Sequence, residues 1–335
     1  MNAWISRFSC AAVVGWLLLQ GLHLQAEGTP SLPWRAGSDE YCIARQEVLL
    51  YGKKGPDWRT AQNHLYRFDL ATSTLARLLS DETESTFLKY AAQHLDASPD
   101  GRFLVFITLA PEIQRGATRI LLLDVASGHL RILVSNERNN IFPKFSPDGR
   151  EVAFYHSSAD IEMHKWEPGT KGFALSIINI ATSEIRQLAL EDWRLYHEGP
   201  PSWSPDGKYL AYSGMYGQKG GGEIYVVPTN GAESRRISPP DIAWCREPVW
   251  LSNSMILYNA SPGLFIVNAD GTGNRPLFRG AVSGMPYVSP DGRKICFTGV
   301  PLPSSDRQSR LIVLDITGKI LPSPHPDVIL HKWRR

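Results

Sequence analysis

The tetrapeptide Ser-Pro-Asp-Gly occurs four times in this chain and constrains its fold more than any other feature. The copies are Ser98–Gly101, Ser146–Gly149, Ser204–Gly207 and Ser289–Gly292. Proline pre-sets the first corner of a type I turn, aspartate bonds its own backbone, and glycine accepts the left-handed conformation that closes a hairpin loop. A tetrapeptide that recurs between apolar strands predicts a repeated β-hairpin and a repetitive architecture. We therefore assign its serines and aspartates to turns and not to catalysis.

A fixed aromatic residue accompanies these turns, eight positions after each serine. Two further units lack the tetrapeptide but carry the same kind of aromatic. The six positions are Tyr51, Phe106, Phe154, Tyr212, Tyr258 and Phe297. We expect these rings to fill the interfaces between neighbouring sheets.

A second pattern also occurs six times: a short apolar strand that ends in a polar residue or proline, with turn residues after it. These strands are Leu65–Asp69, Ile120–Asp124, Leu175–Asn179, Ile224–Pro228, Leu264–Asn268 and Leu311–Asp315. A further short strand follows, such as Ile185–Leu188. Four short strands in a period of roughly 40 to 60 residues are typical of one propeller blade. The predicted fold is all-β: a six-bladed β-propeller of four-stranded antiparallel blades.

The repeated units resemble the WD-type repeats of the TolB-like six-bladed propellers. The segments that carry the resemblance are Pro201–Tyr212, Glu223–Pro228 and Leu264–Thr272, and the likeness extends over roughly residues 40 to 322. TolB itself carries an α/β domain before its propeller, and we expect that domain to be missing here. Prolyl-oligopeptidase-type enzymes also contain propellers, but this chain has no Gly-x-Ser-x-Gly elbow, which excludes a serine peptidase.

The N-terminus has the features of an export signal. Arg7 precedes the short apolar segment Cys10–Leu19, and Leu24-Gln25-Ala26 ends it with a small residue. The apolar segment is too short for a bilayer span of about 20 residues. We predict a signal peptide at 1–26, a lead-in at 27–39 and the TolB-like propeller at 40–335. The expected location is periplasmic or secreted, with no stable membrane span after cleavage.

Composition and cysteine usage narrow the possible partners. A formal net charge of +2 argues against a dedicated nucleic-acid surface, so no nucleic-acid partner is expected. Cys42, Cys245 and Cys296 follow the predicted signal, and no Cys-x-x-Cys occurs among them. A cysteine metal site is therefore not expected. Whether any two of these cysteines are bridged stays open.

The two faces of such a propeller differ in chemistry. Antiparallel order places the short turns between the first and second, and third and fourth, strands of each unit on one face, and the longer connections on the other. The longest is expected from about Tyr155 to Gly172. Binding residues favour irregular loops on a rigid scaffold, although polar residues there are equally explained by solvent. The predicted ligand- or partner-binding residues are His94, Asn140, His156, His164, Trp166, Trp193, His197, Glu198, Arg246 and Glu247.

Two functions are compatible with this sequence. The first is an exported, non-catalytic binding or scaffold propeller. It would engage a protein partner or a small ligand, including carbohydrate, through its loop-rich face and channel mouth, with no catalytic residue, metal or cofactor. The alternative is a carbohydrate-active lyase or hydrolase that uses His156, His164 and His197 as metal ligands or bases. That arrangement resembles the oligogalacturonate lyases, a family with a metal at the channel mouth.

Overall fold

The structure of the chain is a computed structural model. The structure describes residues 40–45, 48–53, 62–69, 74–80, 83, 93–110, 117–157, 173–188, 199–215, 222–289, 292–302, 308–322 and 329–332. These residues form β-strands joined by turns, which confirms the all-β fold class. Within these ranges no helix has the length and apolar character needed to cross a membrane.

Four sheets contain four antiparallel strands each, in sequence order. The first consists of β1 (Glu40–Arg45), β2 (Val48–Lys53), β3 (Gln62–Asp69) and β4 (Thr74–Arg77). The second consists of β5 (Gln93–Ala97), β6 (Phe103–Leu109), β7 (Thr118–Asp124) and β8 (Leu130–Val134). The third consists of β9 (Asn140–Phe145), β10 (Glu151–Ser157), β11 (Phe173–Asn179) and β12 (Ile185–Leu188). The fourth consists of β13 (Ser202–Trp203), β14 (Tyr209–Met215), β15 (Gly222–Pro228) and β16 (Arg235–Arg236).

The remaining strands form one sheet of seven. They are β17 (Arg246–Ser252), β18 (Met255–Ala260), β19 (Gly263–Asn268), β20 (Arg275–Val288), β21 (Lys294–Pro301), β22 (Gln308–Asp315) and β23 (Ile329–Lys332). The long strand β20 pairs with β19 through its first part and with β21 through its second. This sheet therefore contains two sets of four strands that share β20. The count of six blades stays a prediction.

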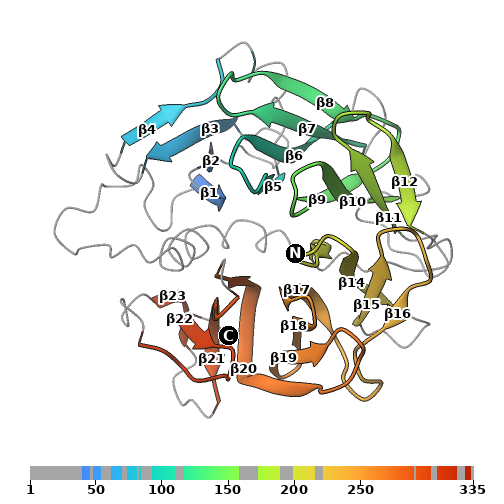
Figure 1. Cartoon of the computed structure of the whole chain (residues 1–335). Coiled ribbons are helices and arrows are strands. Elements are labelled where there is room, and N and C mark those ends of the chain that lie inside the picture. Colours follow the sequence, from blue (N-terminus) through green and yellow to red (C-terminus); the bar gives the residue numbers. More distant parts are fainter. Residues whose placement is uncertain are drawn as a thin grey trace.

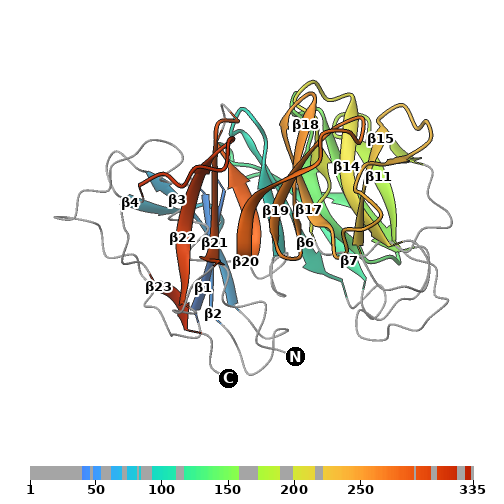
Figure 2. The same cartoon turned by 90° about the horizontal axis from the view of Figure 1, so that it is seen from below.

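The sheets are arranged around a central axis (Figure 1). Strands β5, β9 and β17 lie on the inner side of the ring, whereas β4, β8, β12 and β16 lie on the outer side. Seen from below, the strands run between the two faces of the ring (Figure 2). The last strand, β23, pairs with β22, so the C-terminal segment extends the last sheet.

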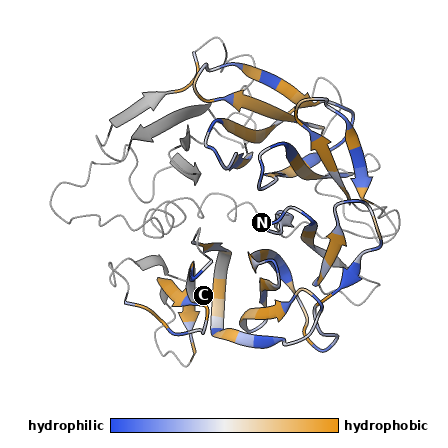
Figure 3. Ribbon diagram, viewed as in Figure 1, coloured by the Kyte–Doolittle hydropathy of each residue, from blue (hydrophilic) through white to orange (hydrophobic). Residues whose placement is uncertain are grey.

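The hydrophobic core lies between neighbouring sheets, and apolar residues are concentrated on the strands (Figure 3). Alternate residues of one strand belong to different clusters: Phe106 packs with Leu79, whereas Val105 packs with residues of the third sheet. Tyr258 likewise packs against Ile224 of the fourth sheet. The five fixed aromatics whose side chains are described are at most 2% exposed. Their predicted position between sheets therefore agrees with the structure.

The three tetrapeptides that are described in full, at 98–101, 146–149 and 204–207, form the predicted hairpin turns. In the second sheet the Ser98 hydroxyl donates to Asp100 Oδ1 over 2.6 Å and accepts the amide of Phe103 over 2.8 Å. Gly101 has φ 71°, in the left-handed region, and its amide donates to the carbonyl of Ser98. Successive turns also touch, because a Cβ added at Gly149 would lie 3.5 Å from Pro99. The turns therefore join neighbouring sheets as well as strands.

A second repeated contact joins the fourth strand of one four-strand set to the turn after the third strand of the next set. Arg131 of β8 donates to the carbonyl of Ile180 over 2.6 Å. The equivalent pairs are Arg186 with Thr229, Arg235 with Ala269, and Arg275 with Ile316. Each acceptor is the first residue after the third strand of a four-strand set. The arginine contacts thus link β8, β12, β16 and the first part of β20 to the next turn around the ring.

Candidate functional site in the central channel

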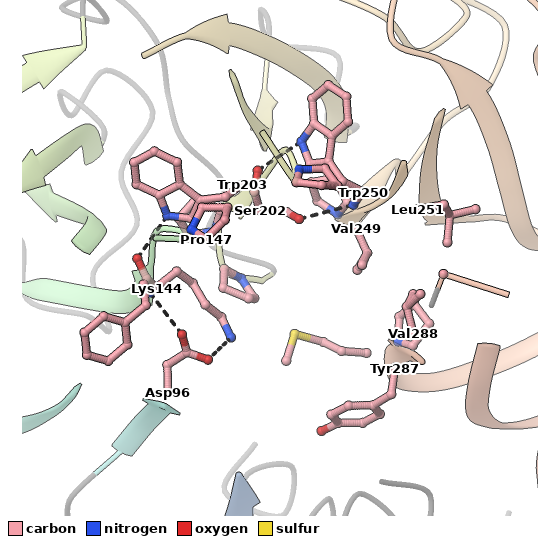
Figure 4. A pocket seen from close by; sticks show the side chains of 18 of the residues that line it. Asp96, Lys144, Pro147, Ser202, Trp203, Val249, Trp250, Leu251, Tyr287 and Val288 are labelled. Carbon is pink, nitrogen blue, oxygen red and sulfur yellow. Dashed lines mark hydrogen bonds and ion pairs between the residues drawn. The ribbon is translucent and has the colours of Figure 1, made fainter. Parts of the chain in front are cut away.

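A cavity of about 740 Å³ occupies the channel between the inner strands (Figure 4). Its lining residues come from β5, β9, β13, β17 and the second part of β20. The turn residues Pro99, Pro147 and Pro205 line it as well, so the cavity extends toward the face of short turns. Five successive inner segments therefore build one site.

Hydrogen bonds between neighbouring inner strands fix the cavity wall. The ammonium of Lys144 on β9 lies 2.7 Å from Asp96 Oδ1 on β5, and both side chains are largely buried (Figure 4). The other oxygen of Asp96 accepts the amide of Phe145 over 3.0 Å. A carboxylate with both a cation and an amide donor is well compensated for its burial. This pair therefore joins the second sheet to the third at the channel.

The indoles of two tryptophans form further hydrogen bonds between neighbouring inner strands. Trp203 Nε1 donates to the carbonyl of Lys144 over 3.0 Å, and Trp250 Nε1 donates to the carbonyl of Ser202 over 3.1 Å (Figure 4). The amide of Trp250 also donates to the hydroxyl of Ser202 over 3.2 Å. Strands β9, β13 and β17 are thus each bonded to the inner strand before them. The wall is consequently pre-organised before any ligand binds.

The rest of the described lining is mostly apolar. It includes seven prolines, together with Val249, Met285 and Tyr287. Proline has a fixed φ and no amide hydrogen, so this surface is rigid and offers few backbone donors. Apolar walls with a few placed polar groups are typical of ligand sites of this size.

Three inner strands carry non-glycine residues in left-handed backbone conformations. These are His94 with φ 53°, Phe142 with φ 53° and Glu247 with φ 55°. Each strand has a register shift in its pairing there or close by. The rings of His94 and Phe142 stack with centroids 3.9 Å apart, and the Phe142 amide donates to His94 Nδ1 over 3.2 Å. Such conformations occur at functional sites, and of these three residues Glu247 lines the cavity.

Glu247 lines the cavity from β17. Its amide donates to the hydroxyl of Ser213 over 3.1 Å, and its Oε2 accepts the side-chain amide of Asn259 over 3.2 Å. A Cβ at Gly199 would lie 2.9 Å from the Glu247 side chain, so glycine permits the close approach there. Residues of neighbouring segments therefore hold Glu247 in place.

The other described members of the predicted site have structural contacts. Asn140 is fully buried, and its side-chain amide donates to the carbonyl of Thr118 over 2.7 Å. Arg246 begins β17, next to Glu247, and is not among the residues that line the cavity. His94 stacks between sheets, as described above. Of these residues only Glu247 lines the cavity.

The prediction that His156 lies in the long loop was wrong. Strand β10 continues to Ser157, so His156 lies in the sheet and not in the long loop. Its side chain is 6% exposed; Nε2 is 2.8 Å from the Ser176 hydroxyl and Nδ1 is 3.0 Å from Arg138 Nη1. Both ring nitrogens therefore have protein partners.

Part of the predicted site falls outside the described residues. These positions are His164, Trp166, Trp193, His197 and Glu198. In the part of the chain that is described, no three histidine, cysteine, aspartate or glutamate residues are grouped to hold a metal ion. Cys245 and Cys296 are free thiols there, and burial raises the pKa of each to about 12.

The cavity-lining positions on the inner strands were missed at the sequence level, although a signal for them exists. Asp96, Lys144, Ser202 and Tyr287 each stand two residues before the serine of a tetrapeptide. Side chains alternate along a strand, so this shared position places all four on equivalent sides of their strands. The repeat therefore identifies the channel wall.

Antiparallel sheets arranged around a lined central channel define the β-propeller class. The family model of the TolB β-propeller domain (PD40) matches residues 95–324. The chain thus belongs to the TolB β-propeller domain family.

Solved structures share this fold at low sequence identity. TolB from Acinetobacter baumannii aligns with a TM-score of 0.54 and 15% identity, over 82% of this chain and 62% of that one. An oligogalacturonate lyase in complex with manganese aligns with a TM-score of 0.53 and 19% identity, over 78% of this chain and 72% of that one. A prolyl endopeptidase aligns with a TM-score of 0.58 and 13% identity, over 93% of this chain and 46% of that one. The chain spans less than two thirds of that TolB. A search of curated proteins found no match.

Proposed function

We propose that this chain is an exported, non-catalytic binding protein that holds a segment of a protein partner in its central channel. The observation that carries the proposal is the cavity of about 740 Å³, whose wall is assembled from five inner segments. Hydrogen bonds between strands hold that wall in one shape, which lowers the ordering cost of binding. The channel thus supplies the concave, mostly apolar surface that a bound segment requires.

The polar groups of the wall support binding more than catalysis. Asp96 and Lys144 are paired with each other, and the indoles of Trp203 and Trp250 donate to backbone carbonyls. These groups stabilise the wall and anchor the edges of an occupant. His156 is one of the three histidines named for the lyase alternative, and both nitrogens of that ring already have protein partners. The binding function is therefore favoured.

The proposal includes the organisation and location of the chain. Export rests on the leader at 1–26, with the lead-in at 27–39 and the propeller at 40–335. The expected compartment is the periplasm or the exterior. A small ligand, including a carbohydrate, in the same cavity is the second possible occupant, because aromatic and proline surfaces also accept sugar rings.

A photo-cross-linking experiment tests the proposal. A photoreactive amino acid replaces Val249, which lines the cavity, and in a matched protein it replaces Ile185, which lies on the outer strand β12. Cross-linking in the source cells should give a partner adduct from position 249 and none from position 185. The additional substitution Met285→Trp should abolish that adduct by filling the channel, with no change in melting temperature. No adduct, or equal adducts from both positions, would contradict the proposal.

A further inference from the structure

Trp244 is a half-exposed tryptophan in an unusual backbone conformation. It is 49% exposed, whereas the channel tryptophans Trp203 and Trp250 are 9% and 6% exposed. Its φ of 61° lies in the left-handed region, where a bulky residue is rare and strained. Tryptophan is highly buried on average in folded proteins. Local backbone preference and core packing therefore do not explain this residue at this position.

The connector that carries Trp244, at 237–245, is fixed where it leaves β16. Arg236 donates to the carbonyls of Ser238 and Pro239 over 3.0 and 3.1 Å. The Ser238 hydroxyl accepts the amide of Ile224 over 3.0 Å, and Ser238 is buried. Hydrogen bonds to the fourth sheet therefore hold the start of the connector in one position.

The connector is also fixed directly after Trp244. Cys245 is fully buried, and its amide donates to the carbonyl of Gly222 over 2.9 Å. A Cβ at Gly222 would collide with the carbonyl oxygen of Cys245, so glycine permits this close approach. Surrounding residues thus maintain the strained conformation, as is found at functional sites. The backbone presents the indole from a fixed position, which lowers the ordering cost of binding.

Trp244 precedes the strand that forms a continuous part of the cavity wall. Every residue from Glu247 to Asn253 lines the cavity. Asn253 follows β17 in the short turn to β18, so the start of β17 lies at the opposite face, with the longer connections. Trp244 comes three residues before Glu247, which is at most about 10 Å of extended chain. A segment that fills the channel and leaves it at that face therefore passes within reach of Trp244.

We propose that Trp244 is a contact residue for the bound protein segment where that segment leaves the channel, at the face of the longer connections. The group that it receives is an apolar side chain of the segment, since an indole offers a large, rigid apolar surface. Tryptophan is enriched among the residues that dominate the binding energy of protein interfaces. This inference rests on the proposed function, and it adds the exit of the segment and the residue that contacts it there.

Cross-linking at two positions tests the path of the segment. The photoreactive amino acid replaces Trp244 in one full-length protein and Val249 in another, and both proteins are irradiated in the source cells. Mass spectrometry of the digested adducts should identify the same partner from both positions. The two cross-linked residues should lie about five positions apart in one partner segment, because an extended segment has the same rise per residue as the strand beside it.

Variants of Trp244 separate a contact with the partner from a role in the fold. Trp244→Gly removes the indole and relieves the left-handed strain, so it should keep the melting temperature within about 3 °C of the wild type. The adduct yield from position 249 should fall at least about tenfold, since truncation of a dominant interface residue lowers affinity by at least that factor. Trp244→Phe keeps an aromatic ring and should lower the yield less than about threefold.

Two control variants match these changes. Ser183→Gly relieves a left-handed residue with φ 59° at an exposed position between β11 and β12, and it should leave the adduct yield unchanged. Leu302→Ala removes an apolar side chain that is 60% exposed after β21, and it should also leave the yield unchanged. A loss in Leu302→Ala equal to that in Trp244→Gly would mean unspecific apolar contact and would overturn the inference.

The outcomes distinguish this inference from the proposed function. If position 249 gives no adduct, binding of a protein segment in the channel is wrong and the inference fails with it. If position 249 gives an adduct but position 244 does not reach the same segment, or if Trp244→Gly keeps the full yield, only the contact by Trp244 is wrong. If Trp244→Gly melts more than about 3 °C lower, the cross-link at 244 decides: the same segment supports the contact, and its absence means that Trp244 acts through the fold.

Discussion

In the tetrapeptide turns that are described in full, Asp100, Asp148 and Asp206 each accept the amide of the residue that follows the turn. The hydroxyl of Ser98 holds the pKa of Asp100 below its ordinary value of 3.8, and the amide of Arg102 adds to the effect. The hydroxyl of Ser204 has the same effect on Asp206, with the amide of Lys208 contributing. A carboxyl group with a lowered pKa stabilises the folded protein in its ionised form. These single residues therefore couple turn stability to pH.

The acid sensitivity of these turns can be measured. Because the folded pKa of each carboxyl lies below 3.8, its stabilisation is present above that value and is lost as the pH falls through the lower folded pKa. The melting temperature of the wild-type protein should therefore drop below about pH 4. In the double variant Asp100→Asn and Asp206→Asn that drop should be smaller. Asp241→Asn, outside the tetrapeptide turns, is the control; identical profiles for all three proteins would refute the prediction.

Repeated strands carry repeated contacts that join one sheet to the next. An arginine followed two positions later by leucine or isoleucine recurs in the outer strands, at 131–133, 186–188, 235–237 and 275–277. In the first three copies the arginine reaches the next sheet, and in all four copies the apolar residue is buried in the core. One strand pattern thus provides both a buried packing residue and a hydrogen bond between sheets.

Removal of these arginines should lower the free energy of unfolding by small, additive amounts. Arg131→Ala and Arg235→Ala should each lower the free energy of unfolding by about 1 kcal/mol, since each loses one charged hydrogen bond that is partly open to solvent. The two contacts join different pairs of sheets, so the double variant should cost their sum. Urea denaturation measures all three. Arg150→Ala, at an exposed position, should change stability by less than about 0.5 kcal/mol. A double variant no weaker than either single one would contradict additivity.

The hydrophobic cores of the molecule lie between sheets, and each contains residues from more than one sheet region. Phe106 is fully buried with Leu79, Leu95 and Leu121, which come from two successive sheet regions. Clusters of the same kind connect the third sheet to the fourth and the fourth to the seven-stranded sheet. Each sheet therefore loses core contacts when its neighbour unfolds. We expect the ring to unfold cooperatively.

A substitution in one core tests this cooperativity. Phe106→Ala should cost about 3 to 5 kcal/mol, because it leaves a cavity where an aromatic ring was fully buried. Phe106→Leu keeps most of the apolar volume and should cost roughly 1 to 2 kcal/mol. Far-ultraviolet circular dichroism and tryptophan fluorescence should shift together in denaturant as one transition. Separate transitions for the two probes would show that the sheets unfold independently.

The local sequence pattern was sufficient to predict the strands and turns, but it was not sufficient to predict the site. The six predicted apolar strands lie within β3, β7, β11, β15, β19 and β22. By contrast, His156 was expected in a loop and lies in β10, because a polar residue at a strand end looks the same in sequence as the first residue of a loop. Asn140 was expected at a channel mouth and is buried against Thr118. Polarity predicted that these residues need partners, but it did not show whether those partners are protein or ligand.

The repeated turn residues of this chain are enough to establish its hairpins, its all-β class and its relation to TolB propellers. Turn geometry depends on a few adjacent residues, so it can be recognised from local order. The channel is different, because Asp96, Lys144, Ser202 and Glu247 come from four inner strands that are far apart along the chain. Their meeting, the pairing of Asp96 with Lys144 and the left-handed Glu247 arise from how the sheets pack around the axis. The repeat marks Asp96, Lys144 and Ser202 two residues before a tetrapeptide. Which of these side chains meet depends on long-range packing, so only the folded ring reveals their contacts.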